Sequence, residues 1–248
     1  MRASVVAVAL LGLAACGSDT DDVRTEMSGP SSIPFPTDAG EMPTVGGTSS
    51  QILLLADSKE AGAQWSGKSY IYDRAEASWT ELRGGVALDR PVVGHIATSF
   101  VVFGLAGCEN LDCDDGTGQM VVLNESTMEW EEGDSLELPE PAFFGAQWLG
   151  NSADSGFFLA NYAVLRTDSL GRAGLARPLV GAWSFCLAGD RVIAIAPEAE
   201  AKPDSSGGAD QIDSTGLGTP RYGTSVVYEL QTDSLEAAEW RRLTALRR

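Results

Sequence analysis

Histidine-dependent acid–base or nucleophilic chemistry could use only one residue of this chain. His95 is the only histidine, so a serine or cysteine nucleophile activated by a histidine would have to use it. A zinc site built from several histidines is excluded by the same count. We therefore expect His95 to be a structural histidine whose polar atoms are satisfied within the fold.

An acidic loop is the one candidate metal site. Residues 110–118 place three carboxylates close together, at Asp112, Asp114 and Asp115. Oxygen ligands at this density suit Ca²⁺. The order departs by one residue from that of an EF-hand loop, and the glutamate such a loop needs is not in place. A solvated loop is the expectation, with calcium binding as the alternative; no other cofactor is predicted.

Carboxylates elsewhere do not define a catalytic pair. Residues 58–65 and 152–159 resemble the Asp box of sialidase-like propellers, each with one departure from the pattern. Asp boxes are structural turns, whereas a glycosidase needs a carboxylate pair or a tyrosine nucleophile. Because acidic residues occur throughout the chain, no catalytic residue is assigned.

Four cysteines are present. Cys108 and Cys113 lie in one loop, and a disulfide between them is expected if the protein is exported to an oxidising compartment. Cys186, in an apolar stretch, is expected to be a buried and inert thiol. Pairing of Cys186 with one of the loop cysteines stays open.

The N-terminal residues predict an export signal. Arg2 precedes an apolar run, Val5–Ala15, that is too short to span a membrane. The run ends in Leu13-Ala14-Ala15-Cys16, after which the chain becomes polar. This resembles the signal and lipobox of bacterial lipoproteins, in which cleavage falls between the residues equivalent to Ala15 and Cys16. A secretory signal cleaved elsewhere nearby is the alternative.

The resemblance implies where the protein lies. A diacylglyceryl thioether on Cys16 and a further acyl chain such as palmitate would anchor it to the cell membrane on the extracytoplasmic side. Two chains give stable anchoring, whereas one gives only marginal binding. We expect a signal peptide over residues 1–15 and a lipidated cysteine with a disordered tether over 16–42, which is rich in Ser, Gly, Pro, Asp and Thr.

The net charge of the chain indicates which kinds of partner it can bind. The chain of 248 residues carries 17 basic and 35 acidic side chains, a net charge of −18. Such a chain repels phosphate backbones, so nucleic-acid binding is not expected. Solubility at a cell surface explains the acidity; a cationic partner or bound metal ions are the alternative.

Residues 43–248 contain an internal repeat. Pro43-Thr-Val-Gly46 recurs at Pro91–Gly94, at Pro141–Gly145 with one extra residue, and at Pro178–Gly181. A tryptophan that follows a strand and a turn is a second landmark, found at Trp79, Trp130 and Trp240. A polar insertion near 198–220 lengthens the last unit.

Short runs rich in Val, Ile, Leu and Phe lie between these landmarks, at residues 51–55, 99–103, 156–159 and 191–195. No segment after the signal has a sustained helical period. Units of this length with several short strands are typical of β-propeller blades. The prediction is an all-β, propeller-like fold with about four blades.

The landmarks resemble those of kelch-type propellers. The matching elements are Pro91-Val-Val-Gly-His95 before a strand that ends at Gly104, and Tyr72-Asp73 seven residues before Trp79. The resemblance implies that the tryptophans pack between blades and that His95 is structural. The chain departs from the family pattern in three ways. The two adjacent glycines of the family are separated here, as Gly104-Leu-Ala-Gly107, and the third unit has no tryptophan at the equivalent position. Four units are also fewer than the six or seven that the family usually has.

These features favour a non-catalytic, surface-tethered propeller that binds a protein or a glycan of the cell envelope through its loops. A glycan-active enzyme that uses acidic residues is the first alternative. A structural or assembly lipoprotein is the second. Carboxylates converging on the propeller axis would favour the enzyme, and an exposed aromatic patch would favour the binding protein.

Overall fold

The computed structural model describes residues 33–40, 43–58, 62–85, 87–106, 117–138, 146–176, 178–179, 181–189, 191–199, 220–231 and 240–247. All the regular elements within these ranges are β-strands. None of the described residues forms a helix long and apolar enough to cross a membrane.

Within the described ranges, sixteen strands form one eight-stranded and two four-stranded antiparallel sheets. The eight-stranded sheet contains two units of four strands, joined by a short pairing of Gln64 with Asp89 and of Trp65 with Leu88, and we call the four units blades. Blade 1 contains β1 (Thr44–Gly47), β2 (Gln51–Ser58), β3 (Gly62–Asp73) and β4 (Ser78–Glu81). Blade 2 contains β5 (Leu88–Ile96), β6 (Ser99–Leu105), β7 (Thr117–Asn124) and β8 (Glu129–Glu137). Blade 3 contains β9 (Ala146–Ser152), β10 (Ser155–Ala160), β11 (Ala163–Asp168) and β12 (Ala173–Leu175). Blade 4 contains β13 (Ser184–Ala188), β14 (Arg191–Ala199), β15 (Pro220–Gln231) and β16 (Trp240–Arg247).

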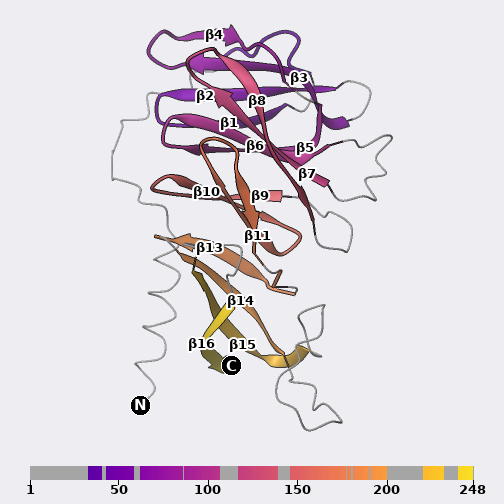
Figure 1. Cartoon of the computed structure of the whole chain (residues 1–248), viewed down its shortest axis with the longest axis vertical. Helices are drawn as coiled ribbons and strands as arrows, with labels where there is room; N and C mark the ends of the chain where they lie inside the picture. Colours follow the sequence, from indigo (N-terminus) through magenta and orange to yellow (C-terminus); the bar gives the residue numbers. More distant parts are fainter. Residues whose placement is uncertain are drawn as a thin grey trace.

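The blades stack face to face in chain order. Figure 1 shows blade 1, in indigo and violet, at one end of the molecule and blade 4, in orange and yellow, at the other. Their first strands meet in sequence, since β1 contacts β5, β5 contacts β9 and β9 contacts β13. The all-β, propeller-like fold with four blades is thus confirmed, and the described blades form an open stack.

The repeat predicted from the sequence corresponds to these blades. All four apolar runs lie on the second strand of a blade, β2, β6, β10 or β14. Pro91 lies on β5, and Pro43 immediately precedes β1. Residues 141–145 and 200–219 lie outside the described residues, whereas both ends of the predicted insertion continue β14 and β15.

Alternation along the strands explains why the blades must stack. Successive side chains of a strand point to opposite faces. Leu53 and Leu55 of β2 join the core between blades 1 and 2, whereas Leu54 between them joins a different cluster. In β6, Phe100 packs toward blade 1 and Val101 toward blade 3. Each blade is therefore apolar on both faces and needs a partner on each.

Two repeat glycines lie where the next blade approaches most closely. A Cβ added to Gly46 on β1 would lie 2.3 Å from Val93 Cγ1, and one added to Gly94 on β5 would lie 2.3 Å from the indole ring of Trp148. Real Cβ atoms do not approach this closely, so both positions need glycine. At Gly46 and Gly94, the missing side chain thus leaves the space that a side chain of the following blade occupies.

In three blades, the turn between the third and fourth strands is capped by an Asp or Asn side chain that accepts hydrogen bonds from backbone N–H groups of the turn. Asp73 Oδ1 accepts hydrogen bonds from the backbone N–H groups of Ala75 and Glu76. Asn124 caps the turn of blade 2 in the same way, and Asp168 caps that of blade 3. Side-chain caps of this kind stabilise tight turns. This geometry accounts for the fixed spacing from Asp73 to Trp79.

The end of the predicted tether belongs to the folded domain. Residues 33–40, here called the strap, pack on the face of blade 1 that has no preceding blade. Ala39 is buried with Leu54 and Tyr70, and its carbonyl accepts a hydrogen bond from the Asp57 N–H at 3.2 Å. The prediction of a disordered tether as far as residue 42 is therefore wrong for the strap, because its few apolar side chains cover an apolar sheet face.

Candidate functional site

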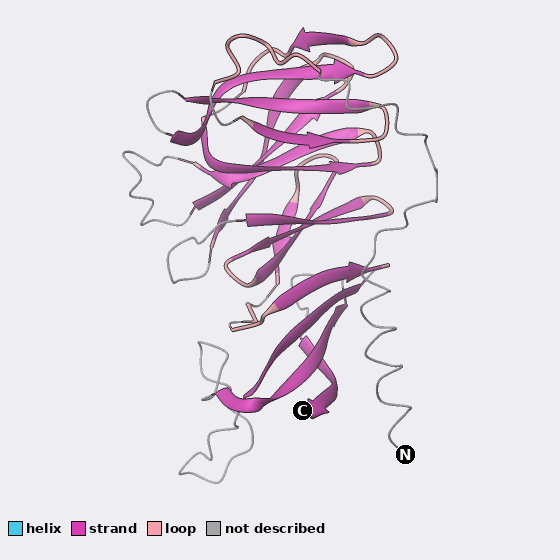
Figure 2. Ribbon diagram, turned by 180° about the vertical axis from the view of Figure 1, so that it is seen from behind, coloured by secondary structure: helices cyan, strands magenta, loops and turns pink. Residues whose placement is uncertain are grey.

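The connections between strands differ on the two faces of the stack. Strands alternate in direction, so the connections after even-numbered strands share one face. Counted from the strand bounds, five of the seven connections that leave from that face contain six residues or more, whereas seven of the eight that leave from the opposite face contain four or fewer. Residues 107–116, 139–145 and 200–219 of these connections lie outside the described residues. We call these the long-loop face and the short-turn face. Figure 2 shows the strands crossing the molecule between the two faces.

An open pocket lies in blade 1 near the long-loop face. Its volume is about 470 Å³, and it is lined by Gly67, Lys68, Glu81, Leu82, Arg83 and Gly84. Gly67 and Gly84 have left-handed backbone angles, with φ of +85° and +69°. These conformations favour glycine. The absence of side chains at both positions leaves the pocket wide and exposes its backbone.

An ion pair borders this pocket. Lys68 Nζ donates to Asp38 Oδ2 of the strap at 3.0 Å, and both side chains are about half exposed. The Tyr70 hydroxyl and the Lys68 ammonium beside Asp38 lower the pKa of that carboxyl. Asp38 in turn raises the pKa of Lys68. Both groups therefore stay charged at neutral pH.

Aromatic rings lie on the same face of blade 1 as the Lys68–Asp38 ion pair. Tyr72 pairs with Trp79 across β3 and β4, with ring centroids 5.1 Å apart. Phe35 of the strap lies 6.1 Å from Trp79 and is 55% exposed. Because side chains two residues apart share a strand face, Tyr72 lies on the same face of β3 as Lys68. We call the set Phe35, Asp38, Lys68, Tyr72, Trp79, Glu81 and Arg83 the blade-1 surface.

Trp79 differs from the other two landmark tryptophans. Trp130 packs edge-on against Trp65 of the preceding blade at 5.2 Å, and its Nε1 donates to Ser69 Oγ at 2.7 Å. Trp240 packs in the cluster between blades 3 and 4. Trp79 instead contacts the strap, where its Nε1 donates to the Pro34 carbonyl at 2.9 Å. The strap takes the place of a preceding blade.

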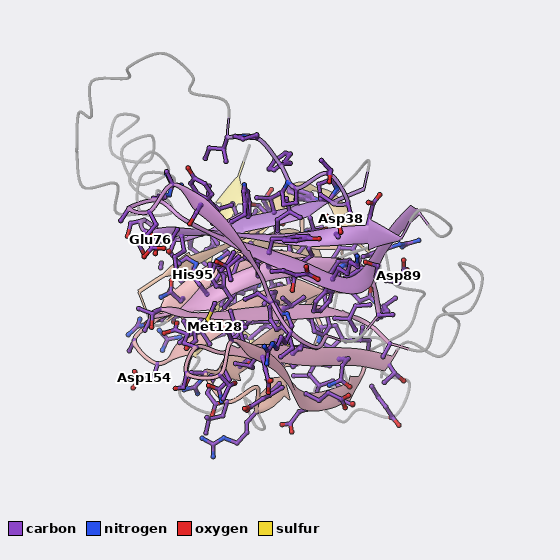
Figure 3. All side chains as sticks on the ribbon, turned by 90° about the horizontal axis from the view of Figure 1, so that it is seen from above. Asp38, Glu76, Asp89, His95, Met128 and Asp154 are labelled. Atoms are coloured by element: carbon purple, nitrogen blue, oxygen red, sulfur yellow. The ribbon has the colours of Figure 1, made fainter. Side chains whose placement is uncertain are left out.

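His95 lies on β5 beside Trp148, with ring centroids 6.0 Å apart. Burial lowers its pKa. Seen from above in Figure 3, His95 lies on the same side of the molecule as Glu76, Met128 and Asp154, whereas Asp38 and Asp89 lie on the other side. Among the described residues, no hydrogen bond joins His95 to a serine or a carboxylate, so the geometry gives it no catalytic partner there.

Several predicted site residues lie outside the described residues: Ala15, Cys16, Cys108, Asp112, Cys113, Asp114 and Asp115. Within the described ranges, no group of three or more His, Cys, Asp or Glu is placed to hold a metal ion. Residues 152–159 span the turn between β9 and β10 and most of β10, early in blade 3. The Asp-box-like stretch at 58–65 is described only in part.

Cys186 corrects one expectation. It is disulfide-bonded, and its partner cysteine lies outside the described residues. The prediction of an inert free thiol is therefore wrong. Cys186 lies on β13 between Phe185 and Leu187, which both pack in the cluster between blades 3 and 4.

Sequence reasoning did not find the blade-1 surface. Lys68, Glu81 and Arg83 resemble any exposed charged residues, and Asp38 was assigned to the tether. Two signals were present: the glycines at 67, 84 and 85, and the single aromatic ring of Phe35 in a polar stretch.

Comparisons with known proteins show that this chain is similar to solved structures in its fold only. No protein-family model matches the chain, and no curated protein matches it. Solved structures that are similar include YjhT, with 14% identity over 63% of this chain and a TM-score of 0.41. The β-propeller domain of the trilobed protease from Pyrococcus furiosus has 7% identity over 82% and a TM-score of 0.48.

The GH43 β-1,3-galactosidase BT0265 has 10% identity over 83% of this chain and a TM-score of 0.38. The chain spans 60%, 58% and 45% of the lengths of these three structures. At this degree of likeness, the activities named for these proteins do not extend to the present chain.

Proposed function

We propose that the protein is a lipid-anchored, extracytoplasmic binding module whose propeller binds a protein or glycan of the cell envelope without catalysing a reaction. The observation that carries the proposal is the difference between the two faces. The described strand ends from which long connections leave lie on one face of a rigid stack of sheets, and loops held by such a scaffold are the usual place for recognition. The pocket at Lys68 adds a concave feature near that face.

The lipid anchor at Cys16 and the kelch-like landmarks are part of this proposal. Since the strap is folded onto blade 1, the tether comprises at most residues 17–32. A flexible chain of that length has a root-mean-square reach of roughly 20–24 Å. The propeller would thus lie close to the membrane and act on partners in its immediate vicinity.

Crosslinking on intact cells tests the binding function. Affinity purification after crosslinking should recover one envelope protein, or glycan-bearing material, in constant ratio to the propeller. Recovery of the propeller alone would contradict the proposal. Hydrolysis of an envelope glycan by the purified protein would instead support the enzyme alternative.

Substitution of Cys16 tests the anchor separately. Cys16→Ala removes the sulfur that would carry the diacylglyceryl group, so we expect the protein to move from the membrane fraction to the soluble fraction and to lose incorporation of labelled palmitate. Ser18→Ala, a nearby substitution that keeps the sulfur, should leave both readouts unchanged. Membrane retention of the Cys16→Ala protein would show that the anchor lies elsewhere.

A further inference from the structure

We propose that the blade-1 surface is a binding site for a neutral oligosaccharide. The inference rests on the proposed binding function and deepens it, since it names the ligand class and the side chains. It combines an exposed aromatic group with a mixed polar pocket on one face of β3 and β4.

The aromatic end is formed by Phe35, Tyr72 and Trp79. Phe35 is 55% exposed, and its ring lies 6.1 Å from that of Trp79. The Trp79 ring is held in place by Tyr72 and by the hydrogen bond from its Nε1 to the Pro34 carbonyl. Rigid aromatic rings offer large contact areas at small cost in conformational entropy. Such rings suit the C–H faces of sugars.

The polar end of the site has equal numbers of cationic and anionic side chains, which supply hydrogen-bond donors and acceptors. Lys68 and Arg83 supply N–H groups, and Glu81 and Asp38 supply carboxylate oxygens. With Asp38, which borders the pocket through its ion pair with Lys68, two positive and two negative groups leave the polar end of the site without net charge. Hydroxyl groups both donate and accept hydrogen bonds, so a polyhydroxylated molecule can use all four side chains, whereas an ion would meet repulsion from half of them.

Whole-molecule charge also favours a neutral ligand. The net charge of −18 repels polyanions at long range. Binding of a neutral molecule, in contrast, should be nearly independent of salt, because screening acts on charge–charge attraction.

The dimensions favour a chain of sugars. Lys68 and Tyr72 lie four residues apart on β3, which corresponds to about 13 Å along a strand. The strap lies between the two ends, since Ala39 packs on Tyr70 and Phe35 and Asp38 contact Trp79 and Lys68, respectively. A ligand that contacts both the pocket and the rings therefore extends along the strap, and a single sugar ring would not reach both.

Titration calorimetry of the purified full-length protein with hexasaccharides of glucose, mannose and xylose tests the site, with hexagalacturonate as the acidic comparator. We expect at least one neutral hexasaccharide to bind, with an affinity that changes little between about 0.05 and 0.5 M salt. Phe35→Ala should weaken that binding about tenfold, in line with the loss of one stacked ring. Arg83→Gln should weaken it as well.

Leu170→Ala is the matched control, because Leu170 is an exposed apolar side chain of blade 3 and is 70% exposed. It should bind as the unmodified protein does, and unchanged thermal melts should show that all variants fold. Absence of binding to every neutral hexasaccharide, equal binding by Phe35→Ala, or preference for hexagalacturonate would overturn the inference. If the oligosaccharide tests failed but crosslinking recovered an envelope protein, the oligosaccharide site would be rejected and the proposed binding function would be retained.

Discussion

At the scale of single residues, the environment of His95 determines the direction in which its pKa is shifted. The ring is packed beside Trp148, and burial lowers its pKa. A general base works best with a positioned partner and a pKa near the working pH. Among the described residues no hydrogen bond joins His95 to a serine or a carboxylate, and the structural role of this histidine stays a prediction.

The lowered pKa of His95 predicts how stability depends on pH. In the unfolded chain the imidazole has its ordinary pKa of 6.5, and in the folded chain the value is lower. Between the two values the unfolded state binds the extra proton, so the free energy of unfolding falls as pH is lowered through this window.

His95→Gln removes that linkage. Melting temperatures measured from pH 7.5 down to about 5 should fall less steeply for the variant than for the unmodified protein. Because His95 is the only histidine, no second imidazole contributes to the difference. Identical slopes would show that the ring titrates alike in the folded and unfolded states.

The landmark tryptophans show how one residue type serves two environments. Trp130 and Trp79 occupy the same position on the fourth strand of their blades, and each indole N–H has a hydrogen-bond acceptor. For Trp130 the acceptor belongs to the preceding blade, and for Trp79 it belongs to the strap. The repeat fixes the residue, while its surroundings depend on what lies before the blade.

At the scale of elements, the first strand of each blade determines how closely neighbours approach. Gly94 on β5 leaves the space that the Trp148 indole of β9 fills. A methyl group there would overlap the ring, and overpacking of a close contact costs about 1–3 kcal/mol.

Gly94→Ala should therefore lower the free energy of unfolding by about 1–3 kcal/mol, measured by urea denaturation. The double variant Gly94→Ala/Trp148→Leu should be destabilised by less than the sum of the two single variants, because the smaller side chain makes room for the methyl group. Additive effects would mean that the glycine is needed for a reason other than this contact.

At the scale of the whole molecule, an open stack leaves its first blade with one uncovered face. Leu54, Ala56 and Tyr70 point to that face, and the strap covers them with Ala39. A blade with two apolar faces cannot leave one in water without losing burial energy. The strap therefore acts as the terminal cap of the stack, and it also connects the propeller to the proposed anchor.

Deletion of residues 33–40 should lower the free energy of unfolding by about 2–4 kcal/mol, the scale expected for exposing these apolar contacts. It should also increase binding of a hydrophobic dye. Deletion of residues 25–32, an equal length of chain before the strap, serves as the control and should change neither. Equal stability of the two deletion variants would contradict the capping role.

Much of this architecture could be predicted from the sequence, because each blade repeats the same local chemistry. The recurring Pro–Gly segment, the apolar run of the second strand and the turn before the tryptophan all depend on residues close together in the chain. Strand period and turn chemistry act locally, so the all-β class, the four units and the hairpins followed from spacing alone.

Only the tertiary structure decided which surfaces meet. The strap belongs to the domain because the first blade has an uncovered apolar face, and no local pattern in residues 33–40 shows this. The blade-1 surface joins Asp38 to Lys68 and Phe35 to Trp79 across 30 and 44 residues of chain. Contacts between residues so distant in sequence depend on how sheets pack, which neither composition nor spacing determines.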